Sequence, residues 1–183
     1  MSLDALKTRL PDYAKDIKLN LGGVLTPGHL NEAQVWGTAL ASAIAARNDV
    51  VTQAIAAEAK ARLSPQVFTA AQQAAAVMAM NNIYYRFTHL MTQGDYGKLP
   101  ARLRMNAIAT HGIEKRDFEL FSLAVSAVNG CGLCLEAHER EVLGKGASRE
   151  QVQDAVRIAA VIHAAATVID AEAALAEGAR AAA

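Results

Sequence analysis

The chain has 183 residues, of which 52% are hydrophobic and 20% charged, enough apolar material for one buried core. Its 18 basic and 18 acidic side chains balance, so no net positive field gathers phosphates, and nucleic acid is not expected as a partner. The opening MSLDALKTRLPDYAKD is polar, unlike an export signal, and no uninterrupted apolar run of about 20 residues predicts a membrane span. We expect a soluble intracellular protein forming one domain over residues 1–183.

Apolar residues recur at helical spacing along the chain, and the alternation typical of strands is nearly absent. The sequence therefore predicts an all-α fold. Ser64 before Pro65, and Ser148 three residues before Gln151, are helix-start signals. The segment MAMNNIYYRF is interpreted as packing. In chain order, helices are predicted near residues 2–9, 11–20, 31–46, 48–62, 65–91, 100–110, 117–128, 131–144 and 148–177.

A faint internal repeat is suggested at an offset of about 84 residues. Both halves follow the same order of helix, short break, helix, cap and long helix. In this register Arg47, Val50 and Ala54 stand opposite the two cysteines and a histidine of the second half. If the repeat is real, the first copy is scaffold and the second copy carries the chemistry.

Both cysteines of the chain lie in the stretch NGCGLCLEAHE. On a helix that begins near Gly130, the side chains of Cys131, Cys134 and His138 form one stripe. The free N–H groups of a helix start stabilise a thiolate, a cysteine one turn away can close a disulfide, and an imidazole can move the proton. In a reducing compartment, such a pair is typical of catalysis, redox exchange or metal binding.

The preceding helix, DFELFSLAVSAV, holds Glu119 inside its apolar sequence. A buried ionised carboxylate needs a partner. If the two helices form a hairpin, Glu119 can reach His138, fix its tautomer and raise its basicity. The pattern therefore favours a relay of carboxylate, imidazole and thiol.

Other interpretations remain open on these residues alone. The spacing C-x2-C-x3-H supplies three zinc ligands, with His111 or His163 as a conceivable fourth, which would make a zinc-stabilised helical interaction module. The cysteines could also be two inert core thiols. Glu119 alone could complement its helix dipole, and His138 alone could lie on a solvated face. A thioredoxin fold is excluded because it requires strands.

Several stretches resemble the alkyl hydroperoxidase D (AhpD) family, which belongs to the AhpD-like and carboxymuconolactone decarboxylase superfamily. They are LPDYAKDIKLNL, QVWGTALASA, MNNIYYRF, LRMNAIA and, above all, DFELFSLAVSAVNGCGLCLEAHE. The resemblance covers nearly the whole chain and implies an all-helical homotrimer of the bacterial cytoplasm. It implies an antioxidant, lipoyl-dependent alkyl hydroperoxide reductase or peroxidase. Its dithiol would reduce hydroperoxides, the disulfide of the peroxiredoxin AhpC, or both.

The electrons would come from dihydrolipoamide, carried by a lipoylated dihydrolipoamide acyltransferase with its lipoamide dehydrogenase. No tightly bound cofactor or metal is implied. By resemblance, Cys134 is the nucleophile that becomes a sulfenic acid, and Cys131 is the proton donor and resolving thiol. Glu119 and His138 match the proton relay.

Some family members have histidine immediately before the second cysteine, where this chain has Leu133. That departure leaves the number of imidazoles in the relay open. The superfamily also contains decarboxylases, so decarboxylase-like chemistry on the same scaffold is an alternative function.

Overall fold

The computed structural model of the protein describes residues 1–92 and 94–181, so residues 93, 182 and 183 of the predicted domain lie outside it. Its regular elements are all helical in these ranges, with no strand, which confirms the predicted all-α fold. The α-helices are α1 (Leu3–Thr8), α2 (Lys15–Val24), α3 (Glu32–Ala46), α4 (Asp49–Arg62), α5 (Pro65–Leu90), α6 (Ala107–Thr110), α7 (Lys115–Asn129), α8 (Gly132–Gly144) and α9 (Arg149–Ala181); the 3-10 turns are η1 (Asp12–Ala14) and η2 (Tyr96–Lys98).

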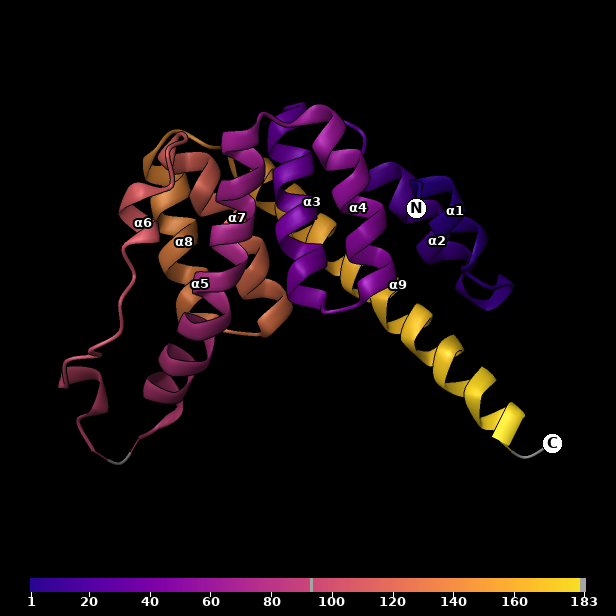
Figure 1. Ribbon diagram of the computed structural model, residues 1–183. Helices are drawn as coiled ribbons and strands as arrows, with labels where there is room; N and C mark the ends of the chain where they lie inside the picture. Colours follow the sequence, from indigo (N-terminus) through magenta and orange to yellow (C-terminus); the bar gives the residue numbers. More distant parts are fainter. Residues whose placement is uncertain (93, 182–183) are drawn as a thin grey trace.

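Helices α3 and α7 lie at the centre of the molecule. They pack against each other, and each also packs against both α5 and α9. Helix α4 lies beside α3, and α8 lies beside α7. Figure 1 shows the resulting arch, with the end of α5 and the segment after it extending on one side and the end of α9 on the other. The central pair therefore holds both halves of the chain to one core.

Helices α3 and α7 pack closely because residue 37 of α3 is a glycine and has no side chain. Gly37 on α3 faces Phe121 on α7, and a Cβ atom added to the glycine would lie 2.1 Å from the Cζ atom of the ring. Both residues are buried. The ring cannot swing into solvent, so any side chain at residue 37 must push the two helices apart.

We therefore expect Gly37→Ala to lower the free energy of unfolding by about 2 kcal/mol and the Tm by roughly 6 °C. Thermal unfolding followed by circular dichroism measures the change. Gly23→Ala in α2 is the matched control, because no atom lies within 4 Å of a Cβ atom added there. If Gly37→Ala lowers the free energy of unfolding no more than Gly23→Ala does, this explanation of the contact between α3 and α7 is wrong.

The internal repeat is visible in the order and spacing of the helices. Lys115 starts α7 83 residues after Glu32 starts α3, and Gly132 starts α8 83 residues after Asp49 starts α4. The long helices α5 and α9 then follow in both copies.

The caps of the two long helices, Ser64 and Ser148, keep the predicted offset of 84 residues, but the register at the two helices before them differs by one residue. Arg47 is the C-cap residue of α3 and Gly130 is that of α7, and both have left-handed backbone conformations, with φ of 60° and 68°. Arg47 thus corresponds to Gly130, and Asn48, not Arg47, corresponds to Cys131. At the cysteines the predicted register was therefore off by one residue, because apolar helices align almost equally well in neighbouring registers.

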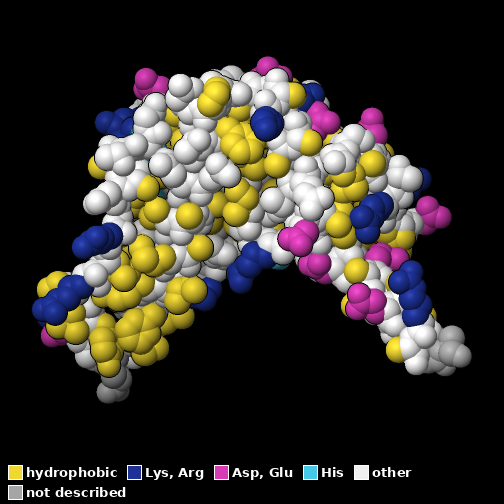
Figure 2. Space-filling model, in the orientation of Figure 1, with side chains coloured by type: hydrophobic (Ala, Val, Ile, Leu, Met, Phe, Trp, Pro, Cys, Tyr) yellow, Lys and Arg dark blue, Asp and Glu magenta, His cyan; other side chains and the backbone are white. Residues whose placement is uncertain are grey.

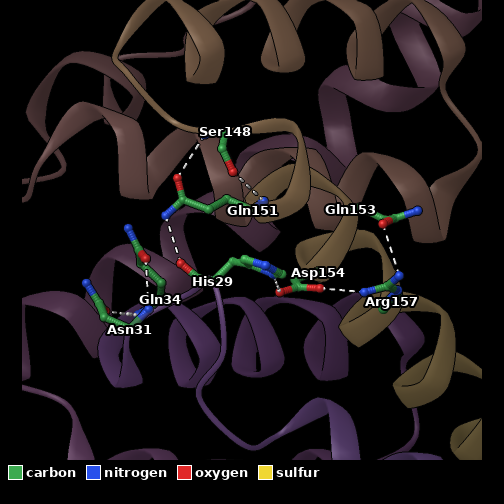
Figure 3. A network of polar contacts seen from close by, with 8 residues as sticks. All are labelled: His29, Asn31, Gln34, Ser148, Gln151, Gln153, Asp154 and Arg157. Atoms are coloured by element: carbon green, nitrogen blue, oxygen red, sulfur yellow. Dashed lines mark hydrogen bonds and ion pairs between the residues drawn. The ribbon is translucent and has the colours of Figure 1, made fainter.

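Side-chain caps fix several helix starts as predicted. Ser64 caps α5 with Pro65 in the first turn, and Ser148 and Gln151 form reciprocal hydrogen bonds at the start of α9. Figure 3 shows how the loop before α3 is tied to this second cap. The Gln151 Nε2 group donates to the His29 carbonyl at 3.0 Å, and the His29 Nδ1 atom lies 2.9 Å from the Asp154 Oδ2 atom.

The predicted helix over residues 100–110 was wrong for most of its length. Only Ala107–Thr110 is helical there, and Arg102 has a φ of 52°, which a right-handed helix cannot contain. All of residues 94–106 are exposed or only partly buried, so no buried side chain anchors a helix there. Conversely, α2 continues through Gly22 and Gly23 to Val24, beyond the predicted end at residue 20, because its packing against α9 outweighs the low helix propensity of the two glycines.

Helix α9 is long and apolar enough to cross a membrane and is the one such helix in the described part of the chain. It packs against α2, α3 and α7. One stripe of its side chains lies in the core, namely Ala155, Ile158, Ala159, Ile162, Ala165, Ala166 and Ile169. The core therefore accounts for this stripe, and 33% of the most apolar window of the helix is buried.

Candidate redox site

A tight turn between α7 and α8 places both cysteines. Gly130 follows α7 in a left-handed conformation, and its N–H donates to the Ala127 and Ser126 carbonyls. The Cys131 N–H then donates to the Ser126 carbonyl at 3.1 Å. Glycine is favoured at this position because a Cβ atom is strained at positive φ. The chain reverses within one residue, and Cys131 becomes the N-cap residue of α8.

Cys131 and Cys134 are joined as a disulfide, with their Cα atoms 5.3 Å apart. Cys131 is fully buried, whereas 6% of Cys134 is exposed. Both sulfurs belong to the first turn of α8, where N–H groups lack helical partners and carry partial positive charge. When the disulfide is reduced, this position stabilises a thiolate.

The structure brings Glu119 of α7 and His138 of α8 together. The His138 Nδ1 atom lies 2.6 Å from the Glu119 Oε2 atom, so a hydrogen bond joins α7 to α8. The side chains are 6% exposed for Glu119 and 14% exposed for His138. Since solvent screens this pair weakly, the carboxylate fixes the orientation of the imidazole ring.

A third side chain, which the sequence did not single out, contacts this imidazole. The Met78 Sδ atom on α5 lies 3.2 Å from the His138 Nε2 atom. Met78 is 2% exposed. The two ring nitrogens of His138 are thus engaged on opposite sides, by a carboxylate from α7 and by a thioether from α5.

Met78 begins a stripe on α5 that continues at every fourth residue with Asn82 and Arg86. The Asn82 Nδ2 group donates to the Ser126 Oγ atom at 2.9 Å, and its Oδ1 atom accepts from the Asn129 side chain at 3.0 Å. The Arg86 Nη1 group donates to the Asn129 carbonyl at 2.7 Å. These contacts clamp the end of α7 just before the cysteines. The sequence analysis interprets this segment only as packing. The spacing of four residues between the polar side chains of Asn82 and Arg86 was the signal in the sequence that could have indicated a shared contact surface.

His111 lies in the segment before α7. Its ring stacks on the Phe118 ring with 4.3 Å between centroids. Burial lowers the pKa of His111, the negative charge of Glu119 opposes that change, and the positive charge of Lys115 adds to it. His111 is therefore biased toward its neutral form. Lys115 also pairs with Glu141, and this bond raises the pKa of Lys115 and lowers that of Glu141.

No group of three or more His, Cys, Asp or Glu side chains is arranged to hold a metal ion in residues 1–92 and 94–181. The donors that the zinc hypothesis requires have other partners in this structure. The two cysteine sulfurs are bonded to each other, and both nitrogens of His138 contact Glu119 and Met78. Of the conceivable fourth ligands, His111 stacks on Phe118, and His163 lines a separate groove beside Asn129.

In the part of the chain that the structure describes, these features define a cysteine pair on a helical scaffold, with a hydrogen-bonded imidazole and carboxylate on the same two helices. Residues 94–177 match the carboxymuconolactone decarboxylase family. The chain is 66% identical over 175 residues to the alkyl hydroperoxide reductase AhpD of Rhodospirillum centenum, covering 96% of this chain and 94% of that protein. The AhpD of Gluconacetobacter diazotrophicus is 59% identical over 96% of both chains, and that of Streptomyces coelicolor is 54% identical over 96% of this chain and 99% of its own. The chain belongs to the AhpD family.

Proposed function

We propose that this protein is a thiol-dependent alkyl hydroperoxide reductase. The observation that carries the proposal is the Cys131–Cys134 disulfide in the first turn of α8, backed by the Glu119–His138 hydrogen bond. The names of its relatives, alkyl hydroperoxide reductase AhpD, support the same activity. Residues 1–183 are proposed to form a single domain, since the described helices share one hydrophobic core.

The proposed reaction begins with the reduced pair. The Cys134 thiolate attacks the distal oxygen of the hydroperoxide, the O–O bond breaks, and the products are a Cys134 sulfenic acid and an alkoxide. The alkoxide takes a proton through His138 and leaves as an alcohol. The Cys131 thiol then attacks the sulfenic acid, which forms the disulfide and releases water. Two electrons thus pass from the two thiols to the peroxide.

The choice of Cys134 as nucleophile is supported by exposure and by position. Cys134 is the partly exposed cysteine, and Cys131 is fully buried. Cys134 is also the third residue of α8, so its sulfur lies within the field of the helix N-terminus. Cys131 would then give a proton and close the disulfide.

An external dithiol restores the pair by thiol–disulfide exchange. The proposed donor is dihydrolipoamide on a lipoylated dihydrolipoamide acyltransferase, kept reduced by lipoamide dehydrogenase, and the proposed protein acceptor is the peroxiredoxin AhpC. The reaction needs no tightly bound cofactor, since both electrons reside on cysteine. The proposed location is the bacterial cytoplasm, where such donors keep thiols reduced.

The proposed homotrimer is supported by an exposed apolar surface. Figure 2 shows hydrophobic side chains gathered on the extension formed by the end of α5 and the segment that follows it. Its large exposed residues are Ile83, Phe87, Leu90, Met91, Tyr96 and Leu99. Continuous apolar surface of this kind is typical of a protein–protein interface. Light scattering of the purified protein measures the oligomeric state.

Peroxide consumption with dihydrolipoamide as donor tests the proposed activity, with and without a peroxiredoxin. We expect turnover with the donor and faster peroxide loss when the peroxiredoxin is added. If the protein consumes no peroxide and leaves the peroxiredoxin disulfide intact, the proposal fails. The name of the matching family makes decarboxylation the alternative, and release of carbon dioxide from a carboxymuconolactone in the same preparation would favour it.

Leu133 lies between the cysteines in the first turn of α8, where some family members have histidine. A protonated imidazole there would stabilise the Cys134 thiolate, whereas leucine adds apolar surface that disfavours a charged sulfur. We expect Leu133→His to move alkylation of the reduced protein by iodoacetamide to lower pH, with a roughly threefold faster rate at neutral pH.

The pH dependence of alkylation gives the comparison, with Leu133→Gln as a polar control that does not titrate. Superimposable profiles for wild type and Leu133→His would place this residue outside the relay.

A further inference from the structure

We infer that Met78 is a positioning residue of the redox site, whose sulfur holds a proton on the Nε2 atom of His138 while the disulfide is closed. The observation is the 3.2 Å separation between the Met78 Sδ and His138 Nε2 atoms. The thioether sulfur can only accept a hydrogen bond. An unprotonated Nε2 atom would oppose its lone pair to those of the sulfur at this distance, so the contact is attractive only when Nε2 carries hydrogen.

The two contacts of His138 also determine how many protons His138 and Glu119 carry together. A separation of 2.6 Å between the His138 Nδ1 and Glu119 Oε2 atoms requires one proton between them. The contact with Met78 requires a second, on Nε2. Whether the first proton belongs to the ring or to the carboxyl group, the pair carries two protons and no net charge. Zero net charge suits side chains that are 6% and 14% exposed, because burying an uncompensated charge is costly.

The groups around His138 agree with this assignment. Glu119 faces it from α7 and Met78 faces it from α5, and the cysteines of its own helix carry no charge as a disulfide. His111 and Lys115 interact electrostatically with Glu119 from the start of α7 and the segment before it.

The proton on the Nε2 atom of His138 is proposed to take part in the reduction of the disulfide. A thiolate of the external dithiol attacks one sulfur of the Cys131–Cys134 bond, and the other sulfur leaves as a thiolate. In the proposed scheme the Nε2 proton of His138 goes to that leaving thiolate, and the second thiol of the donor returns a proton when it closes the donor disulfide. A thioether is a weak acceptor, so it orients the N–H bond without competing strongly for the proton.

The test uses the oxidised, 15N-labelled full-length protein and its Met78→Leu and Met78→Gln variants. Long-range 15N–1H correlation spectra report whether each ring nitrogen of His138 carries hydrogen, and His138→Asn assigns the signals. We expect wild type to show hydrogen on both nitrogens, with Nε2–H exchanging slowly. Met78→Leu keeps the volume but removes the acceptor, so its Nε2–H should exchange at least about tenfold faster. Glutamine supplies an amide oxygen and should restore slow exchange.

The rate of disulfide reduction by dithiothreitol is the second readout. We expect it to fall about tenfold in Met78→Leu at neutral pH and to recover in Met78→Gln. Met80→Leu on the same helix is the control and should leave both readouts unchanged. An unprotonated Nε2 atom in oxidised wild type, or identical spectra for wild type and Met78→Leu, would overturn the inference. It rests on the proposed function only for its relevance to turnover, because neither readout uses peroxide.

Discussion

Replacing Cys134 with serine is expected to lower peroxide turnover by about a thousandfold or more, because the hydroxyl group of serine is not ionised near neutral pH and does not attack the O–O bond. Replacing Cys131 with serine should slow turnover at a later step, because oxidised Cys134 must then react with an external thiol. In that variant Cys134 becomes a sulfenic acid and has no neighbouring thiol with which to condense. The two variants therefore fail at different steps.

Two measurements separate these steps. Turnover is followed with dihydrolipoamide as donor, and the sulfenic acid is trapped with dimedone and located by mass spectrometry. We expect a dimedone adduct, or a mixed disulfide with the donor, on Cys134 of the Cys131→Ser protein. A dimedone adduct on Cys131 of the Cys134→Ser protein, with turnover retained, would reverse the two roles.

The internal repeat shows how the cysteine pair is built into an ordinary helix start. In the first copy Asn48 caps α4, and its side chain accepts the N–H of Val51 at 2.8 Å. In the register of the structure, Cys131 corresponds to Asn48 and Cys134 to Val51. The second copy therefore places two sulfurs where the first copy places a side-chain cap and the amide that it satisfies. The free N–H groups that remain are those that favour a thiolate.

Much of this arrangement could be predicted from local sequence. Helical periodicity indicated the fold class, and Ser64 and Ser148 marked two helix starts, because caps and periodicity depend on residues three or four positions apart. The glutamate inside an apolar helix pointed to a partner, and the structure places His138 beside it.

The contacts of α5 could not be predicted in the same way. Met78 is 60 residues from His138, and Asn82 is 44 residues from Ser126. Nothing in the spacing of an alanine-rich helix says which neighbour its polar stripe will meet. The helix predicted at 100–110 failed for a related reason, since periodicity indicates an apolar face but not whether a core lies near enough to cover it.

Glu119→Gln and His138→Asn are each expected to lower turnover by about a hundredfold, which is the typical contribution of general acid–base catalysis. The two side chains are joined by a 2.6 Å hydrogen bond, and a buried carboxylate without its imidazole has no partner with which to share a proton. Once one member is lost, the other has little left to contribute. The double variant should therefore lower turnover little more than either single change does. If the two residues acted independently, the double variant would lower turnover about ten-thousandfold.

The comparison requires kcat and kcat/KM for all four proteins, with thermal unfolding to verify that each is folded. Arg140→Ala, a change at an exposed residue of α8, is the control and should leave turnover unchanged. A near-equal loss in the three variants would mean that Glu119 and His138 work as one proton carrier, in which the carboxylate acts only through the ring. If the losses multiply instead, each side chain must reach the reacting atoms by a separate route, and the relay as drawn from this structure would be wrong.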